Sequence, residues 1–299
     1  MNLEQAIAAT LVYSDIFDFP LKLKEISYWL PLPISLRELS PLKSIRGLVQ
    51  KGLLAQEDDF YFLPGREKIV VKRKKSQRTS RLKLEISQKV ARILIKVPGV
   101  LLVGLTGNLA MMDVRKNDDI DFLIITQGNK IWTARFLAVL LLEILGRRRR
   151  PKSKQIKDKI CLNLFLDEAH LYLGKDRQDL YTAHEILQMK PLAEKENIYW
   201  QFLEANLWVK NFLPNAFGEK INRSRKNLES NSKKSRGRRI IRMGFVEWLL
   251  GGFQLWHIRK GQTRETIKTG QLFFHPQDKR KEVMEQYRKK SIANGLIKV

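Results

Sequence analysis

The sequence predicts an α/β fold in which a small mixed sheet lies between an N-terminal module of helices and a hairpin and an all-helical C-terminal region. At 299 residues, 43% of them hydrophobic, the chain is long and apolar enough for more than one core. Strand-like apolar runs surround a glycine turn between about 98 and 175, whereas apolar residues elsewhere recur mainly at helical spacing. We expect six segments: a module at 1–65, a connecting helix at 66–97, an α/β domain at 98–175, a helical region at 176–219, a basic linker at 220–239 and a second helical region at 240–299.

The N-terminal segment predicts helices over 3–17, 23–30 and 35–51, followed by a hairpin within 53–65. The third helix would bury one face and expose the other: Leu42, Ile45, Leu48 and Val49 inward, and Lys43, Arg46 and Lys51 outward. This order resembles a winged helix-turn-helix, which implies a recognition helix and a wing. The hairpin tip, 57–59, is acidic and would repel a DNA backbone, so a packing or dimerising module remains an alternative.

The central segment predicts alternating strands and helices. A long amphipathic helix over 66–96 ends before Pro98-Gly99. After it we expect strands at 100–104, 120–126 and 160–166, a short helix at 109–114 and a longer one at 130–145. Beyond it, helices are expected over 179–189, 194–212 and 240–259, with a charged helix from 276 onwards.

Basic residues are concentrated in three segments. The formal net charge is +25, and basic residues outnumber acidic ones by 12 to 2 in 66–96, 8 to 1 in 147–159 and 10 to 1 in 220–242. Such segments attract polyanions, which favours a phosphate-bearing partner such as tRNA or DNA, or an anionic membrane, over a merely solvated surface.

Neither a secretory signal nor an apolar run long enough to cross a membrane is apparent, and the single cysteine, Cys161, cannot form an internal disulfide. We therefore expect a cytoplasmic protein, with Cys161 in the core. For the apolar segment 243–258 we expect burial against other helices, and a membrane surface is the less favoured alternative.

Two carboxylates mark the candidate site. Asp119 and Asp121 are two positions apart at the start of a predicted strand, which places both on one face. Their mutual repulsion is relieved by a cation, and oxygen ligands with open positions suit Mg²⁺ bound to substrate phosphates. The turn at Gly107 offers backbone N–H groups to a phosphate. Capping of the strand by Asp118, Asp119 and Asp121 is the purely structural alternative.

The stretch Gly107-Asn108, ten residues, then Asp119-Ile120-Asp121-Phe122 resembles the signature of polymerase-beta-type nucleotidyltransferases. The resemblance covers about 70 residues and implies a mixed sheet, two Mg²⁺ ions and transfer of a nucleotidyl group from a nucleoside triphosphate to an acceptor hydroxyl. It implies that Thr106, Gly107 and Asn108 hold the nucleotide and that Asp119 and Asp121 hold the metals and are catalytic. The acceptor, whether a tRNA end, a protein side chain or a small molecule, stays open.

The sequence departs from this pattern at the third carboxylate. The later strand carries Asn163 where the family has an acid, and a neutral amide binds Mg²⁺ less strongly and cannot take a proton. Asp167 or Glu168 could substitute. Without a third acid the alternative is a catalytically degenerate protein that acts as a nucleic-acid-binding regulator. The four histidines show no metal-ligand spacing, and we expect His184 to cap a helix or lie on the surface.

Overall fold

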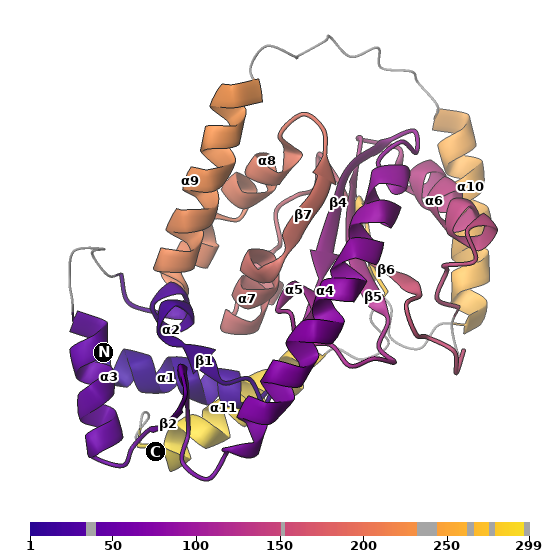
Figure 1. The fold of residues 1–299 in the computed structure, drawn as a ribbon. Coiled ribbons are helices and arrows are strands. Elements are labelled where there is room, and N and C mark those ends of the chain that lie inside the picture. Colours follow the sequence, from indigo (N-terminus) through magenta and orange to yellow (C-terminus); the bar gives the residue numbers. More distant parts are fainter. Residues whose placement is uncertain (34–39, 151–152, 232–243, 262–265, 275–278, 296–299) are drawn as a thin grey trace.

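A six-stranded mixed sheet forms the centre of the computed structural model, which describes residues 1–33, 40–150, 153–231, 244–261, 266–274 and 279–295 (Figure 1). The strand order is β7-β4-β5-β6-β9-β8. Only the β5–β6 pair is parallel among the strand pairs of the described sheet. The strands are β4 (Val100–Thr106), β5 (Ile120–Thr126), β6 (Ile160–Asp167), β7 (Lys190–Glu194), β8 (Thr266–Lys268) and β9 (Gln271–Phe273).

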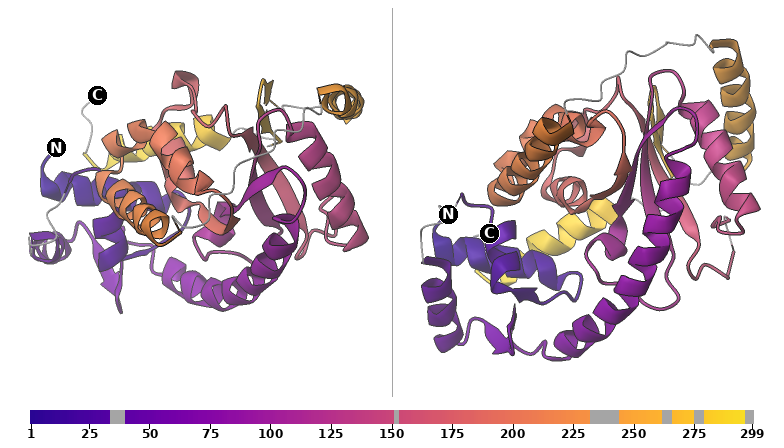
Figure 2. Two further views of the ribbon diagram at one scale, coloured as in Figure 1. Left: turned by 90° about the horizontal axis from the view of Figure 1, so that it is seen from above. Right: turned by 45° about the horizontal axis from the view of Figure 1, so that its top comes forward.

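Helices cover both faces of this sheet, which explains why its central strands are continuously apolar. On one face the second half of α4 and helix α6 share a core with Phe122 and Ile124 of β5, and α10 packs outside α6. On the other face α7, α8 and α9 share a core with Leu123 and Ile125 (Figures 1 and 2). Since side chains alternate along a strand, Asp121 lies on the α7 side. These helices are α4 (Lys68–Leu94), α6 (Ile131–Ile144), α7 (Leu180–Gln188), α8 (Ile198–Ala205), α9 (Pro214–Asn231) and α10 (Gly244–Gly261).

The N-terminal module contains three helices and a three-stranded antiparallel sheet of order β1-β3-β2. Ile45 and Leu48 of α3 are buried while Lys43 and Arg46 are exposed, so the predicted faces of this helix are confirmed. Residues 34–39, where the third helix was expected to begin, lie outside the described residues. The elements are α1 (Leu3–Asp15), β1 (Leu21–Lys22), α2 (Leu23–Trp29), α3 (Ser40–Gln50), β2 (Ala55–Glu57) and β3 (Phe60–Phe62).

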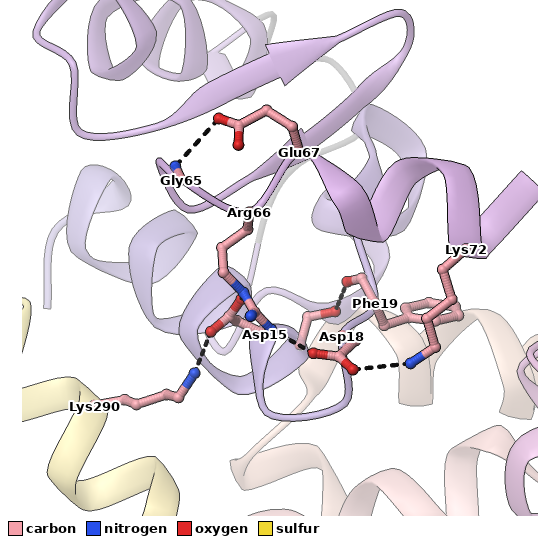
Figure 3. Close-up of polar contacts among 9 residues, drawn as sticks. Asp15, Asp18, Phe19, Gly65, Arg66, Glu67, Lys72 and Lys290 are labelled. Atoms are coloured by element: carbon pink, nitrogen blue, oxygen red, sulfur yellow. Dashed lines mark hydrogen bonds and ion pairs between the residues drawn. The ribbon is translucent and has the colours of Figure 1, made fainter.

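Ion pairs fasten this module to the rest of the chain (Figure 3). Asp15 at the end of α1 pairs with Arg66 just before α4 and with Lys290 of α11 (Lys279–Ala293). Asp18 pairs with the same Arg66 and, at 2.9 Å, with Lys72. The module also shares one continuous apolar core with α7, α8 and α9. The module therefore packs directly against the central domain.

The acidic hairpin tip is bound within the chain. Asp58 pairs with Lys74 of α4, and Asp59 pairs with Lys22 at 2.6 Å. Nearby lysines thus neutralise part of the negative charge of the tip. The repulsion of a DNA backbone that the sequence predicts is therefore weaker.

Two sequence predictions for the C-terminal half are wrong. The region is not all-helical, because β7 pairs with β4 at one side of the sheet and β9 pairs with β6 at the other. These strands have three to five residues, too few for a periodic signal, and pairing with long central strands stabilises them. The helix expected over 194–212 is instead α8 followed by a 3-10 turn, Leu207–Asn211.

The basic linker expected over 220–239 is helical as far as Asn231, within α9, and 232–239 lie outside the described residues. Helix α9 buries Ala216 and Phe217 and carries an intrahelical ion pair between Arg223 and Glu219. Its polar residues therefore belong to the outer face of a helix that packs on the protein through its apolar face. No helix among the described residues is long and apolar enough to cross a membrane.

Candidate functional site

A cleft of about 1840 Å³ opens on the α7 side of the sheet, between β4–β6, the first half of α4 and the N-terminal module. Its described lining contains eleven lysine or arginine side chains against six acidic ones. The basic residues come from five parts of the chain, including α4 (Lys72, Lys75), the loop before β5 (Arg115, Lys116) and the start of α11 (Lys279, Arg280). A cleft with this charge balance attracts anionic ligands.

The two predicted carboxylates lie together in this cleft. One ligand atom each from Asp119, Asp121 and Cys161 fall within 4.8 Å of one another. Burial, helped by the charge of Asp119, raises the pKa of Asp121 to about 7. The predicted proximity of the two acids is therefore confirmed, and the repulsion between them is appreciable.

The glycine turn approaches the same carboxylate closely. Thr106 at the end of β4 pairs with Asp121 across the antiparallel ladder, and Gly107 follows with φ of +64°. A Cβ at Gly107 would lie 2.6 Å from Oδ2 of Asp121, so both the backbone conformation and the space require glycine. Asn108 is exposed and lines the cleft. All three residues predicted to hold a nucleotide thus stand beside the acids.

Asn163 also points into this cluster. Its amide nitrogen donates to Oδ1 of Asp121, and its amide oxygen accepts from Sγ of Cys161 at 2.7 Å. The β5–β6 register skips Asn163, since Phe122 faces Leu162 and Leu123 faces Leu164. A bulge of this kind re-aims a side chain next to a site. Asn163 therefore stands where the resemblance implies the third acid.

Asp167 and Glu168 are wrong as substitutes for that acid. Asp167 pairs in register with Thr126, five residues along β5 from Asp121 and about 17 Å away at the usual rise per residue. It accepts hydrogen bonds from the backbone of Ala169 and binds the His170 ring, while Glu168 accepts from the Gly128 backbone.

An arginine lies against the pair of acids. Nε of Arg149 is 2.9 Å from Oδ2 of Asp119, and Nη1 is 3.3 Å from Sγ of Cys161. Oδ2 of Asp119 is nonetheless buried without an aligned hydrogen bond. A carboxylate oxygen in this state can still accept a cation, so the donor set fits a divalent ion held by oxygen ligands.

Cys161 is therefore beside the site and not in the core, contrary to the sequence prediction. Burial raises the pKa of its thiol to about 12, which keeps it protonated at neutral pH.

The inner face of α4 supports the loop that leads to Asp119. Nζ of Lys83 donates to the Asp118 carbonyl at 2.7 Å and to Asp158 at 2.6 Å, and only 2% of this lysine is exposed. One turn earlier Oγ of Ser80 accepts from the Val114 backbone at 3.3 Å. Lys83 and Ser80 of this amphipathic helix thus hold the loop before Asp119 in place.

One further acid of the cleft was missed by sequence reasoning. Glu185 lines the cleft from α7, and burial together with the charge of Asp121 raises its pKa to about 7. Asp119 and Asp121 are neighbours in sequence, but Glu185 is brought to them only by the packing of α7 on the sheet. The sequence carries no spacing signal for it.

The neighbouring His184 is buried, so the surface or capping role expected for it is wrong. Its ring stacks on Tyr13 of α1 with centroids 4.1 Å apart, and burial lowers its pKa to about 3. It is a neutral ring in the contact between α7 and the N-terminal module.

The basic segments only partly face the cleft. Within 147–150, Arg148 and Arg150 both pair with Glu143, and Arg149 alone of these four lines the cleft. Lys220 is half-buried and donates to the Met189 carbonyl, and desolvation lowers its pKa to about 8. Residues 232–242 of the third segment lie outside the described residues.

Comparisons of the chain with protein-family models, with curated proteins and with solved structures gave no match.

Proposed function

We propose that this protein is a Mg²⁺-dependent nucleotidyltransferase of the polymerase-beta type, which transfers a nucleotidyl group from a nucleoside triphosphate to an acceptor hydroxyl. The observation that carries the proposal is the approach of the Gly107 turn to Asp121, with Asp119 alongside, in a strongly basic cleft. A turn that holds phosphate next to a pair of metal-binding carboxylates is the minimum that this chemistry requires.

Asp119 and Asp121 are the residues that would hold the metal. When bound, Mg²⁺ would neutralise the phosphate charge that develops during transfer. The backbone around Thr106 and Gly107, with the Asn108 side chain, would orient the triphosphate. Arg149, now beside Asp119, can contact a phosphate oxygen once the cation has replaced it at that carboxylate.

Glu185 is the proposed general base. It lines the same cleft as Asp121, whose charge acts on it, and a pKa near 7 allows a carboxylate to accept a proton from an acceptor hydroxyl at neutral pH. Asn163 cannot do this, because an amide does not take up a proton. Its role would be to orient Asp121.

We further propose that the N-terminal module is winged-helix-like and forms the acceptor side of the cleft. Support comes from its helix order, its β1-β3-β2 sheet and the presence of Thr10, Tyr13 and Phe17 in the cleft lining.

The test uses the full chain and four α-labelled nucleoside triphosphates, with Mg²⁺ and a cell extract as the source of acceptor. We expect one labelled product and heat of binding for one triphosphate. Asp121→Asn should lose both, and Glu185→Gln should lose labelling but keep binding. Glu168→Gln, an isosteric change at the far end of β6, is the matched control and should keep both. Well-folded wild type that binds none of the four triphosphates would overturn the proposal.

The contact between Arg149 and Asp119, together with the amide at 163, favours one second candidate. In it the nucleotidyltransferase fold is degenerate and the protein regulates through nucleic-acid binding, with Lys43 and Arg46 on the exposed face of α3 as contacts. A salt-dependent gel shift that survives Asp119→Ala with Asp121→Ala, without labelled product, supports this candidate.

A further inference from the structure

Helix α10 has the reverse of the usual polarity for a helix on the outside of a protein. Its apolar residues Phe245, Trp248 and Phe253 are exposed to 74%, 73% and 58%. Leu249 and Trp256 are also exposed, and the five recur every three or four residues along one face. We call them the α10 stripe.

Two polar side chains of α10, those of Glu247 and Gln254, point the other way, into the protein. Glu247 accepts hydrogen bonds from the backbone N–H groups of Trp132 and Thr133 at 2.7 and 2.9 Å, which caps the start of α6. Gln254 binds Arg135 at 2.6 Å and the Trp132 carbonyl at 2.8 Å. These contacts fix the rotation of the helix, so the outward direction of the stripe is set by specific bonds.

The burial expected for 243–258 is therefore wrong for the outer half of the helix. An exposed row of large aromatic and aliphatic side chains on one helix face is characteristic of a contact surface. No acidic residue lies within the stripe, and Phe245 and Trp248 stack on each other with centroids 6.3 Å apart.

We propose that the α10 stripe docks on an anionic lipid surface. Tryptophan and phenylalanine on one face of a helix, with basic residues at its ends, suit the interface between headgroups and acyl chains. The sequence supplies those basic residues on both sides of the stripe: Lys233, Lys234, Arg236, Arg238, Arg239 and Arg242 before it, and Arg259 and Lys260 after it.

The charge of the neighbouring segments also disfavours a second copy of the chain as the partner of the α10 stripe. A dimer joined through the stripe would combine two copies of these basic segments, each next to the stripe in the sequence, whereas anionic headgroups carry the opposite charge. Helix α10 lies across the sheet from α7, α8 and α9, and none of its residues lines the cleft, so docking leaves the cleft open (Figures 1 and 2). The proposal does not depend on the proposed transferase activity.

The experiment is flotation of the full chain with two kinds of vesicle, phosphatidylcholine alone and phosphatidylcholine with phosphatidylglycerol. We expect binding to the anionic vesicles only, weakened by salt. Trp248→Ser with Phe253→Ser should reduce it by on the order of tenfold or more.

The matched control is Val71→Ser with Leu82→Ser, which removes two exposed apolar side chains from α4 and should not change flotation. Both variants should keep the melting temperature of the wild type, since the altered side chains are exposed. Wild type that does not float with anionic vesicles, or a stripe variant that floats equally well, overturns the proposal. Sedimentation velocity that shows a wild-type dimer, lost in the stripe variant, would assign the surface to a second copy and also overturns it.

Discussion

Around the cleft and in the outer helix α10, the usual polarity of buried and exposed side chains is inverted. In α7, which borders the cleft, and in α4, which supports the loop before Asp119, charged or titratable groups are buried, among them Lys83 and His184, while Leu82 next in sequence is 61% exposed. Helix α10 turns Glu247 inward and Trp248 outward. In both places a polar side chain is turned inward and the apolar side chain next to it in sequence is exposed.

The two places differ in whether the side chains concerned have a partner within the chain. The buried groups of α4 have partners within the chain, such as Asp158 for Lys83 and Glu25 for Arg73. The exposed stripe of α10 has its largest side chains in water, where apolar surface is unfavourable. Buried polar side chains therefore indicate a site whose contacts are all within the chain. Exposed apolar side chains indicate a surface that is stabilised by contact with another molecule.

Lys83→Met should have the largest effect on stability. It leaves Asp158 and the Asp118 carbonyl without their cation, and breaking a buried pair from one side costs about 3–5 kcal/mol. Leu82→Ala, one residue away, should change the free energy of unfolding by less than about 0.5 kcal/mol. Urea denaturation of both variants measures the contrast. Similar losses at the two positions would show that α4 is an ordinary amphipathic helix.

Asn163→Asp should strengthen metal binding in the cleft. Without metal a third carboxylate beside Asp121 raises the repulsion and lowers the melting temperature. Added MgCl₂ should then raise the melting temperature by about 2–4 °C more than in the wild type, because binding to the native state alone is stabilising. Sodium chloride of equal ionic strength is the control. Equal Mg²⁺ shifts in both proteins would place residue 163 outside the metal site.

His184→Gln should change the pH dependence of stability. The pKa of His184 is about 3 when folded, below its ordinary value near 6.5, so the unfolded chain binds a proton that the native state excludes. The stability this provides is complete above pH 6.5 and falls as pH drops from 6.5 toward 3, by about 1 kcal/mol per pH unit. Chemical denaturation between pH 5 and 8 should therefore show a shallower decline in the variant. Parallel curves would contradict the burial of a neutral ring there.

Glu247→Ala should have the smallest of these effects. It removes the cap that α10 provides to α6 and should cost about 1 kcal/mol. Trp248→Ala, its neighbour on the exposed face, should leave the unfolding free energy within about 0.5 kcal/mol. If the tryptophan change proves more costly than the glutamate change, the assigned rotation of α10 is wrong.

The sequence by itself determined the elements around the candidate site. The strands that became β4 and β5, the turn at Gly107 and the spacing to Asp119 and Asp121 are encoded locally, because long apolar runs and a glycine restrict the backbone whatever surrounds them. The three helices of the N-terminal module and the long helix α4 were predicted for the same reason.

Only the tertiary structure decided which residues complete the site and which surface stays open. Strands β7 and β9 exist because longer strands pair with them, and β8 in turn pairs with β9. The bulge that aims Asn163 depends on the register of β5 and β6. Helix packing brings Glu185 into the same cleft as Asp121, and it brings Lys83 to Asp158. A periodic pattern reports how many apolar residues share a face, but hydrogen-bond partners from distant elements decide which face turns inward, and those partners cannot be read from the local sequence.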